Sequence, residues 1–251
     1  MIDARVTDWV KGRSRVVGSV VRTTSEHAVL TYDDGPDPDH TGPILGTLAR
    51  HRATATFFVL LTRARRFRSI VDDIVAEGHE VALHGPDHRP LTDFGYAEAR
   101  RRTQDARAEL EDQVGCPVQW FRPPYGRQSL RTWQATRSAG LVPVMWSATT
   151  WDWREVGQDQ RLAEAVRGAA PGMILLAHDG FAGMQDGAAE EPVPVVDRAG
   201  LTDLVLTAYR ERALSCVSLG RALTGASPVL AASFSGGLLH RRRRKHNEIR
   251  P

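Results

Sequence analysis

The chain has 251 residues, of which 41% are hydrophobic and 25% are charged, and its formal net charge is +3. This composition is that of an ordinary globular chain with enough apolar material for a full core, which excludes a disordered or fibrous chain. The net charge is too small to indicate a nucleic-acid partner by itself, and no apolar run approaches the ~18 residues of a membrane-spanning helix.

Residues 1–26 are polar and weakly patterned, with at most one helix expected around residues 6–11. We interpret them as an N-terminal extension. Acidic residues stand where a secretory signal would be basic, and no apolar segment of the required length follows. The sequence therefore predicts a cytoplasmic protein, and association with the cell envelope by another route stays open.

Residues 27–223 form a central domain in which strand and helix patterns alternate. Repeated β-α-β units imply a parallel sheet with helical crossovers. About seven strands favour a (β/α) barrel over an open sheet, and in both architectures the chemistry lies at the carboxyl ends of the strands. The expected strands are 29–32, 54–61, 80–83, 120–122, 141–146, 172–177 and 214–218, and the expected helices are 41–50, 68–77, 96–114, 129–138, 159–168 and 201–212.

The first of these strands leads into two adjacent carboxylates, Asp33 and Asp34. Asp is unfavourable in strands, and two neighbouring carboxylates repel each other, so an ionised pair indicates a bound cation. A single Asp at such a place is often only a helix N-cap or a turn residue. In a pair, one acid can bind a cation while the other acts as a general base on the cation's water.

His84 and His88 follow the strand at 80–83 and are separated by a loop that contains Gly85 and Pro86. The spacing alone is weak evidence, but here it accompanies the Asp pair at an equivalent strand end. With Asp34, the two imidazoles form the ligand set of a divalent site that leaves positions open for water and substrate. Zinc is the expected metal, and Co²⁺ or Ni²⁺ also suits these ligands.

The segment Arg122-Pro123-Pro124-Tyr125-Gly126 follows the strand at 120–122. Proline has no N–H, so the first backbone donor after the two prolines belongs to Tyr125, where it could face a developing oxyanion. The structural alternative is a rigid turn with a surface arginine.

His178 ends the strand at 172–177. Because the pKa of histidine lies near neutrality, it is a candidate general acid on a leaving group, and a packed core histidine is the alternative. A loop rich in Gly, Asp and Glu follows at 179–200. We favour a substrate lid for this loop over a simple surface excursion.

Residues 224–251 form a C-terminal extension that is rich in Gly, Ala and Ser and ends in a basic tail at 240–246. A short apolar helix is expected near residues 229–234. We interpret the tail as a solvated segment and expect no nucleic-acid partner, although such runs can bind nucleic acid or anionic lipid. Cys116 and Cys216 lie in no metal-binding spacing.

The motifs of the central domain resemble those of the polysaccharide deacetylase family, also called the NodB-homology or carbohydrate esterase family 4 domain. The resemblance extends from about His27 to Leu223. It is carried, in the usual order and spacing, by Asp33-Asp34-Gly35-Pro36, His84-x-x-x-His88, Arg122-Pro123-Pro124-Tyr125-Gly126, Trp153 and Leu176-Ala177-His178-Asp179.

The resemblance implies a distorted (β/α)7 barrel and metal-dependent removal of an acetyl group from an N-acetylated saccharide. By position, it implies a role for each motif residue. The catalytic residues would be Asp33 as general base, His178 as general acid, Tyr125 through its backbone N–H, and Arg122. The metal ligands would be Asp34, His84 and His88. The substrate pocket would include Trp153 and Leu176 around the acetyl methyl, with Pro124 and Asp152 beside them.

Two positions depart from the family's pattern. Members usually carry an Asp four residues before the Trp of the fourth motif, where it pairs with the motif arginine and tunes the catalytic histidine, but this chain has Thr149. A threonine cannot be an anionic partner for Arg122 or His178, although Asp152 lies nearby in sequence. Gly85 replaces the Ser or Thr that commonly steadies the metal loop, so a looser loop is expected.

Two alternatives to an active saccharide deacetylase stay open. Thr149 favours a sugar-binding pseudoenzyme that keeps the metal but has lost turnover, whereas intact Asp33 and His178 argue against it. A hydrolase of a non-sugar amide is the other alternative, since fold does not fix substrate. The absence of an export signal favours a cytoplasmic precursor or oligosaccharide as substrate. The sequence specifies neither the sugar nor the oligomeric state.

Overall fold

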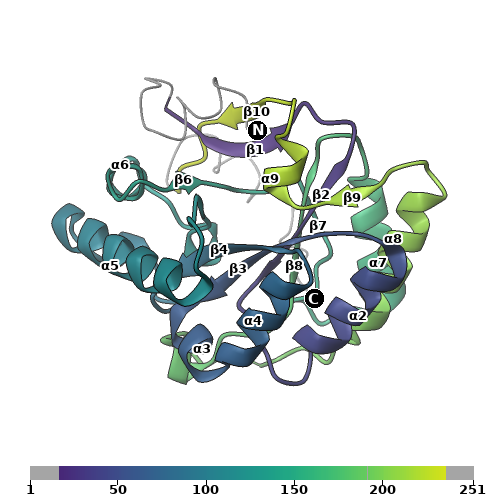
Figure 1. The fold of residues 1–251 in the computed structure, drawn as a ribbon, viewed down its shortest axis with the longest axis horizontal. Coiled ribbons are helices and arrows are strands. Elements are labelled where there is room, and N and C mark those ends of the chain that lie inside the picture. The colour runs from purple at the N-terminus through teal and green to yellow at the C-terminus, as the bar shows by residue number, and fades with distance from the viewer. Residues whose placement is uncertain (1–16, 191, 236–251) are drawn as a thin grey trace, which may run out of the picture.

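The structure is a computed structural model that describes residues 17–190 and 192–235 (Figure 1). The helix expected around residues 6–11 and the basic tail at 240–246 lie outside the described residues. Within the described part of the chain, no helix is both long and apolar enough to cross a membrane.

A parallel sheet forms the centre of the molecule. Along its path the strands are ordered β6-β5-β4-β3-β2-β8-β7, and β9 pairs with β2 in addition. Among the described residues, the two end strands β6 and β7 do not pair with each other, so the curved sheet stays open there. This topology confirms the predicted distorted (β/α)7 barrel. The strands are β2 (Ala28–Asp33), β3 (Thr56–Leu60), β4 (Glu80–Gly85), β5 (Trp120–Phe121), β6 (Val142–Pro143), β7 (Ala148–Thr149), β8 (Ile174–His178) and β9 (Cys216–Val217).

Helices cover the outside of this sheet (Figure 1). The glycines at 78, 115 and 140 follow helices with φ of 80°, 68° and 79°, the left-handed conformation in which many helices end. The first of these helices begins at Thr41 as expected, with His40 as its N-cap. The helices are α2 (Thr41–His51), α3 (Leu61–Arg66), α4 (Arg68–Ala76), α5 (Tyr96–Val114), α6 (Leu130–Ser138), α7 (Gln158–Arg167), α8 (Arg198–Arg210) and α9 (Leu219–Ala222).

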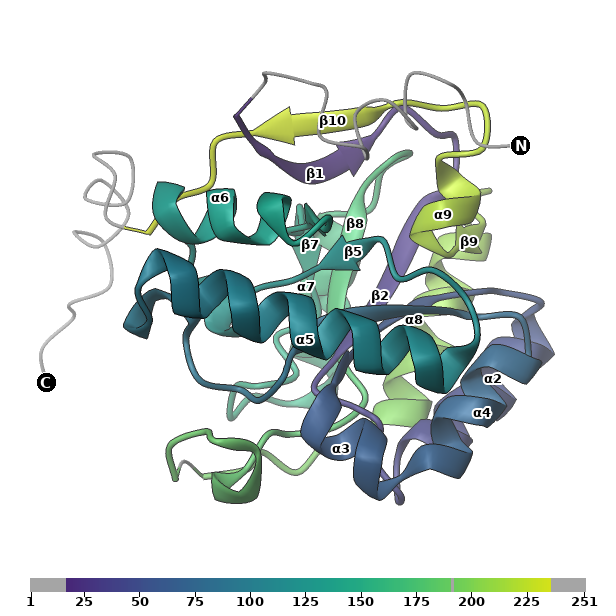
Figure 2. The ribbon, with the colours of Figure 1, turned by 60° about the vertical axis from the view of Figure 1, so that its left-hand side comes forward.

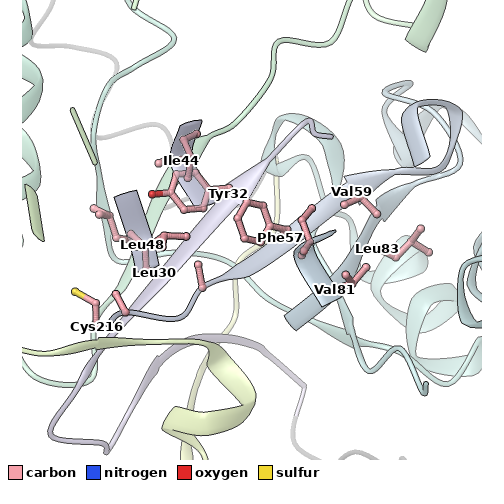
Figure 3. Close-up of a cluster of buried hydrophobic side chains, with 14 of the residues drawn as sticks. Leu30, Tyr32, Ile44, Leu48, Phe57, Val59, Val81, Leu83 and Cys216 are labelled. Atoms are coloured by element: carbon pink, nitrogen blue, oxygen red, sulfur yellow. The ribbon is translucent and has the colours of Figure 1, made fainter. Parts of the chain in front are cut away.

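Alternation along the strands divides the apolar side chains into two cores. Leu30 and Tyr32 of β2 pack against the helices together with Phe57, whose ring stacks on Tyr32 at 5.1 Å (Figure 3). Val29 of the same strand and Phe58 of β3 belong to the inner core. Because side chains alternate along a strand, Asp33 lies on the same face as Val29.

The two predicted extensions meet in a ribbon of β1 (Ser19–Thr23) and β10 (Pro228–Ala231), which pair antiparallel (Figure 2). The helix expected near residues 229–234 is therefore wrong. Its apolar residues form a short strand instead, because β1 offers a hydrogen-bonding partner that the local sequence does not reveal. The division of the chain at residues 26 and 224 stays a prediction.

β1 also crosses the place where the sheet stays open. It forms bridges with Val144 beside β6 and with Met173 beside β8, and the Val20 carbonyl accepts a hydrogen bond from the Met145 N–H at 2.7 Å. The Val20 side chain is fully buried in the inner core. A segment interpreted from sequence as an extension thus completes the interior.

We predict that Val20→Ala lowers the free energy of unfolding by roughly 2 kcal/mol, because it removes buried methyl groups and leaves a cavity. Urea unfolding followed by circular dichroism measures this. Val17→Ala, at a side chain that is 45% exposed, is the matched control and should change stability by less than about 0.5 kcal/mol. Equal effects of the two substitutions would contradict a structural role for β1.

Candidate active site

The parallel register brings the polar strand ends together at one edge of the sheet. Asp33 at the end of β2 is level with His178 of β8 and with Phe58 of β3. His84 lies near the end of the next strand, β4. A cavity of about 400 Å³ opens at this edge. Of the predicted site residues, it is bordered by Asp33, Asp34, His84, His88, Tyr125, Trp153, Leu176 and His178.

Asp34, His84 and His88 form a buried cluster. The Asp34 Oδ1 atom lies 3.3 Å from His84 Nε2 and 3.2 Å from His88 Nε2. One ligand atom from each residue lies within 4.8 Å of the others. In the described structure Oδ1 accepts no hydrogen bond although it is buried. A buried carboxylate oxygen that faces two ring nitrogens in this way fits a divalent cation.

The backbone at Asp34 is unusual and depends on its neighbour. Asp34 has a φ of 73°, in the left-handed region, and its Oδ2 atom accepts a hydrogen bond from the Ala182 N–H at 3.3 Å. A Cβ at Gly35 would lie 2.0 Å from a carboxylate oxygen of Asp179, so only glycine fits there. Burial alone would raise the pKa of Asp34, but His88 and His84 hold it well below its usual range.

Backbone carbonyls orient the two histidines of the cluster, His84 and His88. His84 Nδ1 lies 2.9 Å from the Arg122 carbonyl, which can only accept, so Nδ1 carries the hydrogen and Nε2 is left for a cation. The backbone N–H of His88 donates to the Asp186 carbonyl at 2.6 Å. Gly85 has a φ of 139°, and a Cβ there would lie 2.8 Å from the Asp87 carbonyl oxygen. The loop therefore requires glycine at position 85, and the Asp186 carbonyl anchors it at His88.

Arg122 is fully buried, so the alternative of a surface arginine is wrong. Its Nη1 atom donates to Asp33 Oδ1 at 2.7 Å and to the Thr31 hydroxyl at 2.8 Å. The guanidinium also lies 4.1 Å from the centre of the Phe58 ring. The charge partner of Arg122 is thus Asp33, while the Thr149 hydroxyl accepts a hydrogen bond from the Trp151 N–H.

Asp152 is the partner of His178. Its Oδ1 atom lies 2.7 Å from His178 Nδ1, and its Oδ2 atom accepts from the His178 N–H at 2.7 Å and from Arg198 at 3.2 Å. Burial alone would lower the pKa of His178, but the charge and hydrogen bond of Asp152 raise it to about 9. Asp152 therefore supplies the anionic partner that Thr149 cannot.

Two residues that the sequence places in the substrate pocket lie behind it. Asp152 is 2% exposed and both of its oxygens are engaged, and Pro124 is buried next to the Gly85 backbone. Neither borders the cavity. Tyr125 does border it, with a φ of 58° and its ring 4.3 Å from that of His88.

Sequence reasoning missed several residues of this region. Arg198 and Trp146 belong to no motif, and only the tertiary structure places Arg198 on Asp152. The loop at 179–200 forms a wall of the cavity through Phe181, Ala182 and later residues. Opening of this wall as a lid stays a prediction.

Known proteins resemble this chain in sequence and in fold. A family model for polysaccharide deacetylase matches residues 21–144. The chitooligosaccharide deacetylase of Sinorhizobium fredii is 36% identical over 161 residues, which are 63% of this chain and 74% of that protein. The peptidoglycan-N-acetylglucosamine deacetylase PgdA of Listeria monocytogenes is 34% identical over 62% of this chain and 33% of PgdA. The solved Bc1960 peptidoglycan N-acetylglucosamine deacetylase superposes with a TM-score of 0.70 at 26% identity, covering 86% of this chain and 95% of that one.

We predict that Asp152→Asn lowers the pKa of His178 in the metal-free protein from about 9 by roughly one to three pH units. The substitution removes the negative charge that opposes the cost of burying an imidazolium. NMR titration of the imidazole signals measures this. The control is Asp203→Asn at the more exposed His51–Asp203 pair, which should leave His178 unchanged. An unaltered His178 pKa in Asp152→Asn would contradict the assignment.

Proposed function

Because this chain belongs to the polysaccharide deacetylase family, we propose that it is a metal-dependent hydrolase that removes an N-linked acetyl group from an N-acetylated saccharide. The observation that carries the proposal is the meeting of Asp33, the Asp34-His84-His88 cluster and His178 around one cavity. An acid, a base and a divalent site at one place are what amide hydrolysis by an activated water requires.

Asp34, His84 and His88 would hold the metal, for which we propose Zn²⁺, with Co²⁺ or Ni²⁺ as substitutes. A metal bound there supplies Lewis acidity toward the amide carbonyl and lowers the pKa of water. Asp34 supplies the negative charge of this ligand set, and the hydrogen bond from His84 Nδ1 fixes that ring's orientation. The ligand side chains would therefore be oriented before substrate arrives.

Asp33 would act as the general base and remove a proton from the attacking water. Arg122 holds one of its carboxylate oxygens, Oδ1, which leaves Oδ2 to accept the proton. His178 would act as the general acid. Its Nδ1 atom is engaged by Asp152, so Nε2 would deliver the proton to the leaving nitrogen. The Asp152 carboxylate raises the pKa of His178, which would favour the protonated ring that this role requires.

The remaining residues would bind and orient the acetyl group. We propose that the Tyr125 N–H donates to the developing oxyanion. Leu176 and Trp153 border the same cavity and give it an apolar surface for the acetyl methyl. The substrate class we propose is an oligosaccharide or sugar-containing precursor with N-acetylglucosamine units, as the names of the relatives suggest. The cytoplasmic location stays a prediction.

The pseudoenzyme alternative rested on Thr149. The contacts of Asp152 with His178 and of Asp33 with Arg122 support an active enzyme, because each charged group has a partner without an Asp at position 149. No contact of the described residues favours a non-sugar amide over a sugar amide.

We predict that the metal-reconstituted protein releases acetate from N-acetylglucosamine oligomers and that a chelator stops this release. Asp33→Asn should reduce kcat by about 10²–10⁴-fold, because it removes the general base. Asp39→Asn, at an exposed acid of the following loop, is the matched control and should keep full activity. If the protein binds metal but releases acetate from no acetylated sugar, the pseudoenzyme or non-sugar alternative replaces this proposal.

A second prediction concerns metal binding itself. Loss of a residue that only hydrogen-bonds to a metal ligand typically weakens metal binding by about 10–100-fold. His88→Ala removes a proposed ligand itself, so it should weaken Zn²⁺ binding by more than that. Calorimetric titration of the metal-free protein measures this without any substrate. His27→Ala, at a partly exposed histidine remote from the cluster, should bind Zn²⁺ as the wild type does. Equal affinities of the two variants would exclude His88 as a ligand.

A further inference from the structure

Arg63 of α3 joins three segments that lie far apart in the sequence. Its Nε atom donates to Asp186 Oδ2 at 3.0 Å, its Nη1 atom to Asp37 Oδ2 at 3.1 Å, and its Nη2 atom to the Phe181 carbonyl at 3.0 Å. The side chain is only 11% exposed. A guanidinium offers five N–H donors in a fixed planar arrangement, so it can hold all three segments at set distances.

Each of these segments also carries or contacts a member of the Asp34-His84-His88 cluster. Phe181 precedes Ala182, whose N–H donates to Asp34 Oδ2. Asp186 accepts the His88 N–H through its backbone carbonyl. Asp37 belongs to the loop that begins at Asp34. The guanidinium is therefore close, by short covalent and hydrogen-bonded connections, to two of the three candidate ligands.

The carboxylate of Asp186 is as constrained as Arg63. It is 2% exposed, and besides Arg63 it accepts hydrogen bonds from the Thr62 hydroxyl at 3.1 Å, from the Gly183 N–H at 3.2 Å and from Arg66. A buried carboxylate with this many donors has little freedom to move.

The Arg63 guanidinium also lies over the backbone of Gly180 at the start of the 179–200 loop. A Cβ at Gly180 would lie 2.4 Å from Arg63 Nη1 and 3.1 Å from the Asp34 carbonyl oxygen. Gly180 therefore lies between the guanidinium and the backbone of Asp34, and a larger residue there would press on both. Because Arg63 holds the Phe181 carbonyl, which shares a peptide group with the Ala182 N–H, a shift of Arg63 would move that N–H relative to the Asp34 carboxylate.

We propose that Arg63 and Asp186 are a positioning pair that fixes the orientation of Asp34 and His88 and so sets the affinity and geometry of the metal site. Neither side chain touches the cluster, so the pair acts through the Ala182 N–H and the Asp186 carbonyl. The inference rests on the proposed metal site and extends it to residues outside the family's motifs. It also gives the start of the 179–200 loop a role besides that of a cavity wall.

The test is Zn²⁺ affinity measured by chelator competition, together with the visible spectrum of the Co²⁺-substituted protein. Arg63→Ala should weaken Zn²⁺ binding by about 10–100-fold, as outer-shell partners typically do, and should alter the Co²⁺ spectrum. Arg65→Ala is the matched control. It lies on the same helix but pairs with Glu109 at the surface, so it should leave both measurements unchanged.

Asp186→Asn keeps the size of the side chain and the backbone carbonyl, and it provides a second variant if Arg63→Ala fails to fold. It should weaken Zn²⁺ binding in the same direction. The Zn²⁺ affinity of the double variant should be little lower than that of the single variant with the lower affinity, because the two residues act as a unit. Arg63→Lys should restore part of the affinity, since an ammonium replaces only a fraction of the contacts.

Folded Arg63→Ala and Asp186→Asn proteins with wild-type Zn²⁺ affinity and an unchanged Co²⁺ spectrum would overturn the proposal, even if both melt at lower temperature. That result would mean that the pair only stabilises the loop. A wild-type protein that binds no metal would instead overturn the proposed metal site, and this inference with it.

Discussion

The site depends on one buried interaction, the ion pair between Arg122 and Asp33. The guanidinium lies inside the barrel against Phe58, with Thr31 and Asp33 as partners for one nitrogen. The backbone carbonyl of Arg122 accepts a hydrogen bond from His84 Nδ1, which leaves His84 Nε2 available for a cation. A buried ion pair contributes little net stability, but removing one partner leaves an uncompensated charge that costs about 3–5 kcal/mol. Arg122 therefore couples the proposed base to the proposed metal ligand, and it directly follows a strand of only two residues, β5.

A second buried charged group lies beside the first, since His178 of β8 is level with Asp33 of β2. Asp152 lies between His178 and Arg198. Burial alone would lower the pKa of the His178 imidazole, and the Asp152 carboxylate raises it. Asp33 and His178 thus have environments of opposite charge: Asp33 is hydrogen-bonded to an arginine, and His178 is hydrogen-bonded to a carboxylate. Such opposed environments are how a single site keeps a base and an acid in their working states at one pH. With this pairing, neither Arg122 nor His178 depends on an acid at position 149.

The sequence predicted what local patterns encode. Helix α5 was placed at its observed bounds because its charged, helix-favouring residues end at Gly115, and the cluster of Asp34, His84 and His88 was found because its motifs follow buried strands. Contacts between distant segments were not predictable, so Asp152 was placed in the pocket rather than behind His178. The β10 strand was mistaken for a helix because a short apolar run is compatible with either state, and only pairing with β1 decides between them.

The 179–200 loop meets two different requirements: a fixed backbone beside the proposed metal ligands and a wall that shapes the cavity. Its first part, through Asp186, contacts Arg63, Asp34 and His88, so its backbone must keep one conformation if the metal ligands are to keep theirs. Its later part supplies Ala189 and Pro192 to the cavity wall beyond the Arg63 contacts. Side chains at those positions can change the space offered to a substrate without moving a ligand. The loop therefore separates the geometry of the metal site from the shape of the pocket, although both are built from one continuous segment.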